Sequence, residues 1–482
     1  MMNSKLVFGV IGRLLEILAA ILLLPMLVSV IYRENTFISF LVTALISLVT
    51  GIVLHILCRK HDRTIYAKEG FLIVALSWLV SSFIGSLPFF LSGEVPSYID
   101  ALFESVSGFT TTGASVIPDV EALSHGILFW RSFTHWIGGM GVLVFIIAFA
   151  TNFTERSIHI LRAEMAGPVV GKLMPRAKDT TKILYIIYIV MTVVQIIMLW
   201  AGGMNFFESV VHSLGTAGTG GFGTKSDSIA GYSPYIQWVI GVFMLLFGVN
   251  FNLYYLICTK HGKFALKSTE LWVYICMIII ATSAIAINIS PMYSSLSETI
   301  RTSFFNVTSI TTTTGYSTAD FNLWPTFSKG IIFVLMFIGG CAGSTAGGLK
   351  VSRVVILFKM IAREVRHLIH PRSISTVRFE GKEVEEHTQR NIANYFAVYM
   401  MFLVGLLFIV SLEPFDFETA VSVTVTCFNN VGPGFSFAGP MASYSEFSNL
   451  SKIVLSLAML MGRLEIFPIV IFMFPSSWNR KK

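Results

Sequence analysis

Four glycine-containing stretches decide the fold of this chain. They read Thr110-Thr111-Thr112-Gly113-Ala114-Ser115, Gly218-Thr219-Gly220-Gly221-Phe222-Gly223, Thr312-Thr313-Thr314-Gly315-Tyr316-Ser317 and Asn429-Asn430-Val431-Gly432-Pro433-Gly434. Each follows a short apolar segment; these segments lie at 98–109, 205–216, 297–310 and 415–428. A helix of that length, at about 1.5 Å per residue, reaches roughly 18 to 21 Å and cannot cross a hydrocarbon core of about 30 Å. We therefore predict four half-helices that enter a membrane and turn back.

Composition places the rest of the chain in a bilayer. Hydrophobic residues make up 54% of the 482 residues and charged residues only 13%, whereas a soluble domain carries roughly 25% charged residues. Apolar runs long enough to span the bilayer recur along the whole length. We predict ten crossings, at 6–31, 37–58, 70–91, 126–150, 183–201, 235–257, 271–290, 327–358, 391–412 and 449–474. This composition excludes a soluble enzyme.

The positive charges indicate the orientation in the membrane. Of the 34 Lys and Arg residues, 25 lie in the segments 59–69, 151–182, 258–268, 350–390 and 480–482, and Lys5 and Arg13 lie near the N-terminus. Cytoplasmic loops of membrane proteins carry an excess of Lys and Arg. We therefore predict that these segments and both termini are cytoplasmic. The net charge of +7 then reflects membrane topology and anionic headgroups, and nucleic-acid binding is not expected.

After the first two helices the same unit recurs four times: a crossing, a half-helix, a glycine-containing stretch and a second crossing. Units that cross twice enter with the same orientation and are related by an axis along the membrane normal. We predict an all-α polytopic membrane protein with four M1-pore helix-M2 repeats in a pseudo-fourfold arrangement around one pore. The predicted divisions are two extra N-terminal transmembrane helices (1–69), repeat 1 (70–150), a cytoplasmic linker (151–182), repeat 2 (183–268), repeat 3 with a broken second helix (269–358), a basic cytoplasmic linker (359–390) and repeat 4 (391–482).

The four stretches have the chemistry of a cation filter. A cation that loses its water in a low-dielectric region needs replacement oxygens, and backbone carbonyl groups supply them without a buried counter-charge. Glycine permits the backbone turns that this requires. The C-terminal end of each half-helix adds roughly half a negative charge. A single such stretch is typical of close helix packing, but four in equivalent places favour a filter.

At these residues the sequence resembles the TrkH/TrkG branch of the Trk/Ktr/HKT superfamily of potassium-translocating subunits, over the whole chain. The resemblance implies a potassium-binding filter formed by the aligned glycines and the two residues before each: Thr111, Thr112, Gly113, Thr219, Gly220, Gly221, Thr313, Thr314, Gly315, Asn430, Val431 and Gly432. In the family, glycine at all four aligned positions is associated with potassium selectivity, and serine at the first with sodium transport. Here the first is Gly113. The alternative is a sodium-permeable or ion-coupled transporter of the same fold.

The same resemblance implies the setting of the protein. It implies a bacterial inner membrane, a homodimer, and a cytosolic TrkA-type ring that binds nucleotides and regulates opening. K⁺ is then the transported ion, no covalent cofactor is expected, and a nucleotide acts only through the partner subunit. The segment 350–390, which carries nine Lys and Arg residues, is either a docking surface for such a ring or a solvated loop beside lipid headgroups.

A glycine-rich run at 339–348 interrupts the second crossing of repeat 3. Helix propensity is low there, and irregular backbone at membrane depth is tolerated where protein buries it or where it lines water. The run is either a packing surface for a neighbouring helix or, as the resemblance implies, a mobile loop that obstructs conduction beneath the filter. An arginine in the last crossing is costly in lipid; it either pairs with another helix or, by the same resemblance, sets an electrostatic barrier. The predicted gate residues are Gly343, Ser344, Thr345, Ala346, Gly347 and Arg463.

Motifs for other chemistry are incomplete. The stretch 218–223 matches G-x-G-x-x-G without a βαβ context, and Leu349 stands where a P-loop needs its lysine. His135 and His212 lack metal-ligand spacing, and the five cysteines form no C-x-x-C pair. No nucleophile, base and oxyanion-hole set is visible, so we expect a protein that is not an enzyme. A membrane-embedded transferase would need a carboxylate pair or a histidine cluster at one membrane face.

Overall fold

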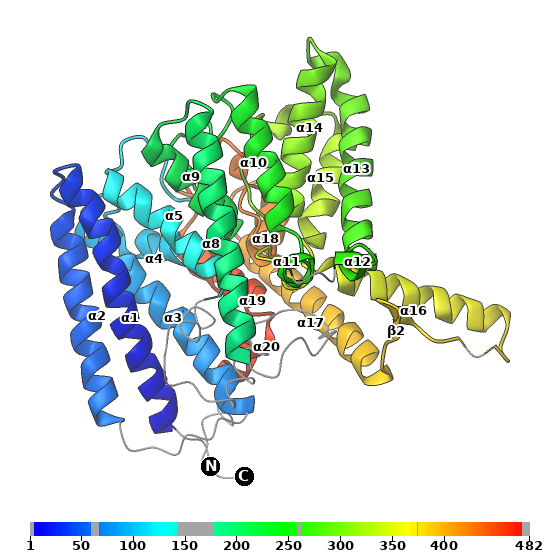
Figure 1. Ribbon diagram of the computed structural model, residues 1–482, viewed down its shortest axis with the longest axis horizontal. Helices are drawn as coiled ribbons and strands as arrows, with labels where there is room; N and C mark the ends of the chain where they lie inside the picture. The colour runs from blue at the N-terminus through cyan, green and yellow to red at the C-terminus, as the bar shows by residue number, and fades with distance from the viewer. Residues whose placement is uncertain (1–3, 59–66, 142–176, 259–261, 374, 475–482) are drawn as a thin grey trace.

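A computed structural model describes residues 4–58, 67–141, 177–258, 262–373 and 375–474 of the chain. These residues form a helical body with one helix projecting sideways from it (Figure 1). Within this part of the chain the strands are β1 (Arg378–Phe379) and β2 (Lys382–Glu383), which pair as a small antiparallel hairpin. The short helical turns are α12 (Gly262–Ala265), η2 (Ser290–Met292), η3 (Phe321–Leu323) and η4 (Ser436–Ala438).

Two helices precede the repeats and pack together at one edge of the body (Figure 1): α1 (Ser4–Ile31) and α2 (Phe37–Leu57). Their backbones approach closely where Gly12 meets Gly51, since a Cβ atom on Gly12 would lie 2.9 Å from the carbonyl oxygen of Gly51. The hydroxyl of Ser47 donates to the carbonyl of Leu15 at 2.7 Å. Small residues and an interhelical hydrogen bond are the means by which membrane helices associate. The predicted N-terminal pair is confirmed.

The four repeats are built in the predicted order. The first helices are α3 (Ala67–Leu91), α8 (Ala177–Ala201), α13 (Thr269–Ile289) and α17 (Glu386–Val410). The half-helices are α4 (Tyr98–Phe109), α9 (Phe206–Gly218), α14 (Leu296–Thr311) and α18 (Phe417–Asn429). The second helices begin as α5 (His125–Gly139), α10 (Pro234–Phe247), α15 (Thr326–Ile338) and α19 (Asn449–Arg463). Each half-helix is too short to span the membrane, and the predicted re-entrant segments are confirmed to within a few residues.

Two of the crossings predicted to be unbroken are broken, in repeats 2 and 4. In the expected crossing 235–257, α10 ends at Phe247 and α11 (Phe251–Cys258) leaves at an angle of 90°. In the expected crossing 449–474, α19 ends at Arg463 and α20 (Phe467–Met473) follows a turn whose residues Glu465 and Ile466 have φ values of 57° and 67°. Among the described residues, six helices are long and apolar enough to span a membrane unbroken. Part of the crossing 126–150, from residue 142 onward, lies outside the described residues.

The predicted break in repeat 3 is confirmed, and it explains the break in repeat 2. α15 ends before Gly339, whose φ is 71°, and α16 (Val351–Ile369) starts only after a loop at 339–350. The N–H of Cys341 donates to the carbonyl of Gly248 at 3.0 Å, and the N–H of Phe251 donates to the carbonyl of Gly343 at 3.1 Å. The segment at 248–251 and the loop at 339–350 therefore form hydrogen bonds with each other. These bonds replace the ones that a continuous helix would have made within itself.

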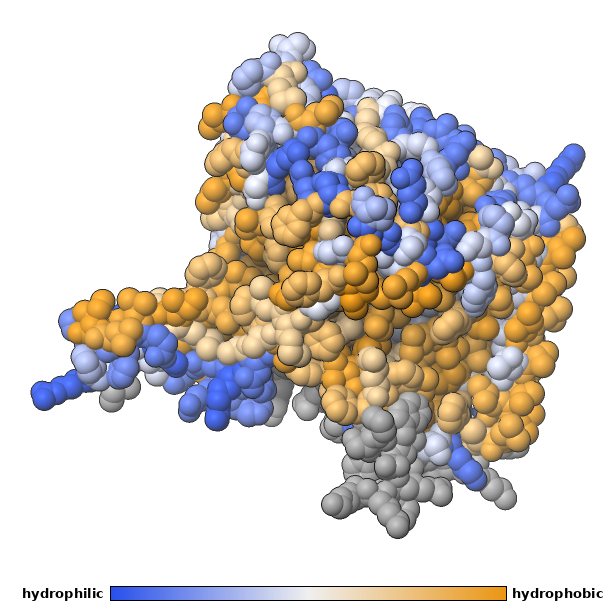
Figure 2. Space-filling view, turned by 180° about the vertical axis from the view of Figure 1, so that it is seen from behind, coloured by the Kyte–Doolittle hydropathy of each residue, from blue (hydrophilic) through white to orange (hydrophobic). Residues whose placement is uncertain are grey.

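α16 is the helix that projects from the body (Figure 1). Exposed apolar side chains, including Phe358, Ile361 and Leu368, recur along it at helical spacing, while Lys359 and Arg363 lie on the opposite face. Figure 2 shows hydrophobic colour along one side of this projection and hydrophilic colour along the other. The basic segment 350–390 is therefore a helix over its first half, followed by the β1–β2 hairpin.

Candidate functional site

The four glycine-containing stretches share one backbone conformation. The residues two positions before the aligned glycines have φ between 55° and 57°: Thr111, Thr219, Thr313 and Asn430. The aligned glycines have φ between 78° and 95°: Gly113, Gly221, Gly315 and Gly432. The residue between them has no positive φ in any repeat. The sign of φ thus alternates in the same way in all four stretches, and such alternation can turn successive peptide groups to the same side.

The left-handed turn also ends each half-helix. In every repeat the N–H of the residue before the aligned glycine donates to the carbonyl five positions back, at 2.8 to 2.9 Å: Thr112 to Ser107, Gly220 to Gly215, Thr314 to Ser309 and Val431 to Thr426. This bond closes a left-handed C-cap. Each glycine-containing stretch is thus anchored directly to the negative end of its own half-helix.

The four stretches meet in a closed ring. A Cβ atom on an aligned glycine would lie within 3.0 Å of the carbonyl oxygen just before the aligned glycine of the next repeat: Gly113 meets Gly220, Gly221 meets Thr314, Gly315 meets Val431 and Gly432 meets Thr112. The last contact joins the fourth repeat to the first. The side-chain amide of Asn430 reinforces that closure, donating to the hydroxyl of Thr112 at 3.0 Å. The twelve predicted filter residues are therefore brought together, and no side chain fits in place of the four glycine hydrogens.

A buried ion pair beside this ring was not predicted from the sequence. Oε1 of Glu104, in α4, lies 2.7 Å from Nε of Arg131, in α5, and both side chains are fully buried. Glu104 also accepts from the N–H of Val116 at 3.0 Å and from the hydroxyl of Ser115 at 3.0 Å. The Arg131 guanidinium stacks on Phe222 at 4.1 Å from the ring centroid. The pair thus supports the chain just after the aligned glycines Gly113 and Gly221. The sequence did contain a signal for this pair. Glu104 and Arg131 are charged residues in apolar segments, and such residues usually have a partner.

Above the ring lies an open cavity of about 200 Å³, lined by all four aligned glycines. Arg131 and Lys225 also line it. The Lys225 ammonium lies 4.4 Å from the centre of the Tyr232 ring, and Arg131 is paired as described. Both positive side chains that line the cavity, Arg131 and Lys225, therefore have partners. The cavity gives access to the ring from this side.

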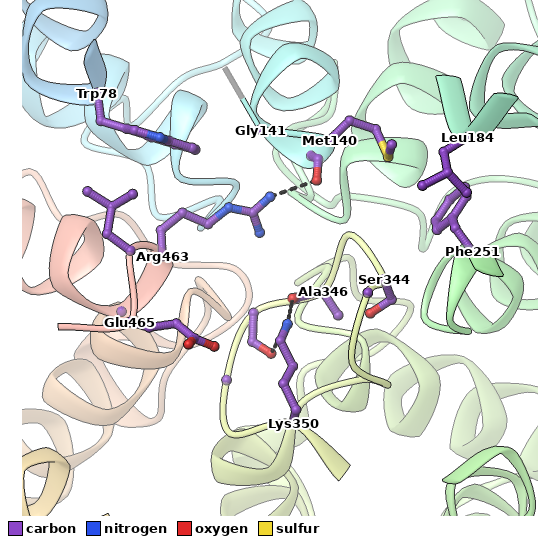
Figure 3. Close-up of a pocket in the computed structure, with 16 residues that line it drawn as sticks. Trp78, Met140, Gly141, Leu184, Phe251, Ser344, Ala346, Lys350, Arg463 and Glu465 are labelled. Atoms are coloured by element: carbon purple, nitrogen blue, oxygen red, sulfur yellow. Dashed lines mark hydrogen bonds between the residues drawn. The ribbon is translucent and has the colours of Figure 1, made fainter. Parts of the chain in front are cut away.

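The interrupting loop of repeat 3 lies directly below the ring. The N–H of Gly347 donates to the hydroxyl of Thr313 at 2.6 Å, and a Cβ atom on Gly347 would lie 2.6 Å from the carbonyl oxygen of Asn429. The Lys350 ammonium, which is buried, donates to the carbonyl of Ala346 within the same loop (Figure 3). Gly347, the last of the predicted loop residues 343–347, is therefore in contact with the lower side of the ring.

Arg463 ties this loop to the opposite side of the structure. Its guanidinium donates to the carbonyl of Thr345 at 2.8 Å, and to the carbonyls of Gly138 and Gly139 at 2.6 and 2.8 Å. These contacts join α19, the loop and the end of α5, which belong to three different repeats. The side chain reaches across a cavity of about 90 Å³ that it lines together with Lys350 (Figure 3). Arg463 is the last residue of α19. It therefore does not lie in the middle of a straight crossing.

The histidines have hydrogen-bonding roles. Nδ1 of His135 lies 2.7 Å from the carbonyl of Gly108, and its Nε2 lies 3.3 Å from the N–H of Phe222. Nδ1 of His212 lies 2.8 Å from the carbonyl of Glu208. Among the described residues, no group of three or more His, Cys, Asp or Glu side chains is placed to hold a metal ion.

Comparisons with known proteins agree over nearly the whole chain. A family model described as TrkH, cation transport protein, matches residues 36–482. The Trk system potassium uptake protein TrkH of Escherichia coli strain K12 is 35% identical over 488 residues, covering 99% of this chain and all of the relative. TrkG of the same strain is 34% identical and covers 99% of both chains. The crystal structure of the potassium transporter TrkH from Vibrio parahaemolyticus is similar with a TM-score of 0.89 at 32% identity, covering 99% of this chain and all of that one.

Proposed function

Because this chain belongs to the TrkH family of cation transport proteins, we propose that it is the potassium-translocating subunit of a Trk-type uptake system. The observation that carries the proposal is the ring in which each aligned glycine faces a carbonyl oxygen of the next repeat. Rings of backbone carbonyls replace the hydration shell of K⁺ in selective channels. The names of the relatives, which are potassium uptake proteins, support the choice of ion.

The proposed path has three parts. K⁺ enters the outer cavity, binds at the twelve filter residues of 111–113, 219–221, 313–315 and 430–432, and meets a gate formed by residues 343–347 and Arg463. The contact between Gly347 and Thr313, at 2.6 Å, supports an obstruction directly below the filter. The bonds from Arg463 to three carbonyl groups support a gate that Arg463 holds closed. Transport needs no catalytic residue, since a membrane potential supplies about 2.3 kcal/mol per charge for each 100 mV.

The proposed setting is a bacterial inner membrane with both termini in the cytoplasm. The protein acts as a homodimer, and a cytosolic TrkA-type ring controls the gate through a nucleotide that this chain does not itself bind. The division into an N-terminal pair at 1–69, four repeats and the two linkers 151–182 and 359–390 rests on the apolar runs, the recurring unit and the charge distribution. The basic character of 350–390 supports a surface for that ring.

Flux into vesicles tests the proposed function. Purified protein in liposomes should take up radioactive rubidium, and external K⁺ should compete while Na⁺ should not. Equal competition by Na⁺, or a reversal potential that follows both ions, would identify the sodium-permeable alternative. Absence of any cation uptake by well-folded protein, including a variant that lacks residues 344–346, would overturn the proposal.

A further inference from the structure

One buried carboxylate holds both ends of the loop beneath the filter. Glu270 lies in the first turn of α13 and is 5% exposed. Its Oε1 accepts from the N–H of Ala342 at 2.7 Å and from the N–H of Ser352 at 3.0 Å. Ala342 lies near the start of the loop and Ser352 just after its end. Charge-assisted hydrogen bonds to backbone N–H groups are among the strong ones, so Glu270 fixes the width of the loop.

A second carboxylate connects the same helix end to the β1–β2 hairpin. Glu380 lies at the hairpin turn, and its Oε1 accepts from the hydroxyl of Ser268 at 2.9 Å and from the N–H of Glu270 at 3.0 Å. Glu380 and Gly381 both have positive φ, at 50° and 74°, as a tight two-residue hairpin turn requires. The hairpin therefore presents a rigidly held carboxylate to the N-terminus of α13, where the helix dipole favours a negative charge.

The hairpin is in turn fixed to the helix that follows the loop. Phe379 is buried with Ile356 of α16, and the ammonium of Lys359 donates to the carbonyl of Arg378 at 2.8 Å. A displacement of the hairpin must therefore strain its contacts with α16, its contacts with α13, or both. Glu270 links the first turns of these two helices, because it lies in the first turn of α13 and accepts from the N–H of Ser352 in the first turn of α16.

The loop also has a connection to the arginine segment of repeat 4. Arg353, in the first turn of α16, forms an ion pair with Glu465 at 2.6 Å. Glu465 is two residues beyond Arg463, which bonds the loop at Thr345. The hairpin, Glu270, the loop and Arg463 are thus parts of one continuous set of contacts.

From these contacts we propose that Glu270 is the positioning residue of the gate and that Glu380 couples the hairpin 378–383 to it. The inference rests on the proposed role of residues 343–347 as the gate. Glu270 sets the loop across the path, and release of the Glu380 cap from α13 lets both loop ends move. A ligand or partner that draws the hairpin away shifts the gate toward its open form to the extent that it prefers that form.

The test compares four variants with the wild type: Glu270→Ala, Glu270→Gln, Glu380→Ala and Glu383→Ala. Glu383 is the matched control because it lies on the same hairpin with an exposed side chain. The first readout is rubidium uptake into vesicles. The second is the labelling rate of Cys341, a buried loop residue, by N-ethylmaleimide, measured by peptide mass spectrometry. The second readout reports loop position without any transport.

We expect Glu270→Ala to raise both uptake and labelling by roughly threefold to tenfold, because loss of a strong bond shifts a two-state equilibrium by about that factor. Glu270→Gln keeps an oxygen that can accept both N–H groups, so it should restore most of the wild-type behaviour. Glu380→Ala should raise both readouts less than Glu270→Ala, and Glu383→Ala should leave them unchanged.

Folded Glu270→Ala protein with unchanged labelling would overturn the positioning role, and Glu380→Ala behaving like Glu383→Ala would overturn the coupling. If Glu270→Ala does not give a single gel-filtration peak, Glu380→Ala decides the proposal, since it leaves the buried carboxylate in place. Failure of the proposed function would look different: no variant, nor the wild type, would take up rubidium, while Cys341 labelling would still respond to Glu270→Ala.

Discussion

Glu104 and Arg131 form an ion pair, 2.7 Å between Oε1 and Nε, with both side chains 2% exposed or less. It joins α4, the first half-helix, to α5, the second helix of the same repeat, next to the ring of aligned glycines. Burying two charges is expensive, and the pair is maintained only because the carboxylate gains two further donors, Ser115 and the N–H of Val116. The pair fixes geometry more than it adds net stability.

Removing one partner should therefore destabilise the protein strongly. Glu104→Gln leaves the Arg131 guanidinium buried without its counter-charge, and we expect a loss of about 3 to 5 kcal/mol in unfolding free energy. The measurement is the thermal unfolding midpoint in detergent. The matched control is Lys329→Met, which removes a pair with Glu418 at 3.2 Å whose side chains are 26% and 50% exposed. That change should cost about 1 kcal/mol or less, and equal effects of the two variants would contradict the argument.

The half-helices and the meeting of the four glycine-containing stretches could be predicted from the sequence because they depend on local quantities. The length of an apolar segment and the recurrence of glycine-containing stretches are visible in a single chain, and equivalent repeats must meet on their common axis. The four glycines could therefore be aligned without knowing how far apart the stretches lie in the structure.

The remaining features depend on partners that are far apart in the chain. The bend after Phe247 exists because Gly248 and Phe251 exchange hydrogen bonds with a loop almost a hundred positions later. The guanidinium of Arg463, at the end of α19, is held by carbonyls at Thr345 and Gly138. A hydropathy pattern does not show such pairings between distant residues. The sequence therefore predicted unbroken crossings at both places.

The first aligned glycine should tolerate no side chain. A Cβ atom on Gly113 would overlap the carbonyl oxygen of Gly220, and its φ is 78°, which strains any L-residue. Gly113→Ala should abolish selective rubidium uptake, or make Na⁺ an equal competitor, because the carbonyl ring must open. Gly405→Ala is the matched control: that glycine has open space around it, lies inside α17, and alanine there should stabilise the helix slightly. Unaltered selectivity in Gly113→Ala would refute the carbonyl ring as the filter.

Shortening the loop beneath the filter should increase flux. Deletion of residues 344–346 removes the Thr345 carbonyl bonded by Arg463 and the Ala346 carbonyl bonded by Lys350, and it should withdraw Gly347 from Thr313. We expect uptake to rise while competition between K⁺ and Na⁺ stays as in the wild type, because the filter residues are unchanged. Gel filtration and the unfolding midpoint establish that the variant is folded. Lower flux from such folded protein would mean that the loop supports the filter and does not obstruct it.

Arg463 should act as a latch through its geometry as well as its charge. Its guanidinium reaches carbonyls of two separate elements at once, Thr345 on the loop and Gly138 and Gly139 at the end of α5. A planar group with five donors can do this, whereas a lysine ammonium is a compact point charge. Arg463→Ala should raise uptake roughly tenfold, since loss of about 1.4 kcal/mol of charged hydrogen bonding changes an equilibrium tenfold.

The lysine variant separates the two contributions of Arg463. If an electrostatic barrier alone limits flux, Arg463→Lys keeps the charge and should conduct like the wild type. If the bridging bonds limit flux, Arg463→Lys should conduct nearly as fast as Arg463→Ala. We expect an intermediate rate closer to the alanine variant, because the bonds join three repeats and one ammonium cannot replace them all. Slower conduction than wild type in both folded variants would show that Arg463 only packs the base of the pore.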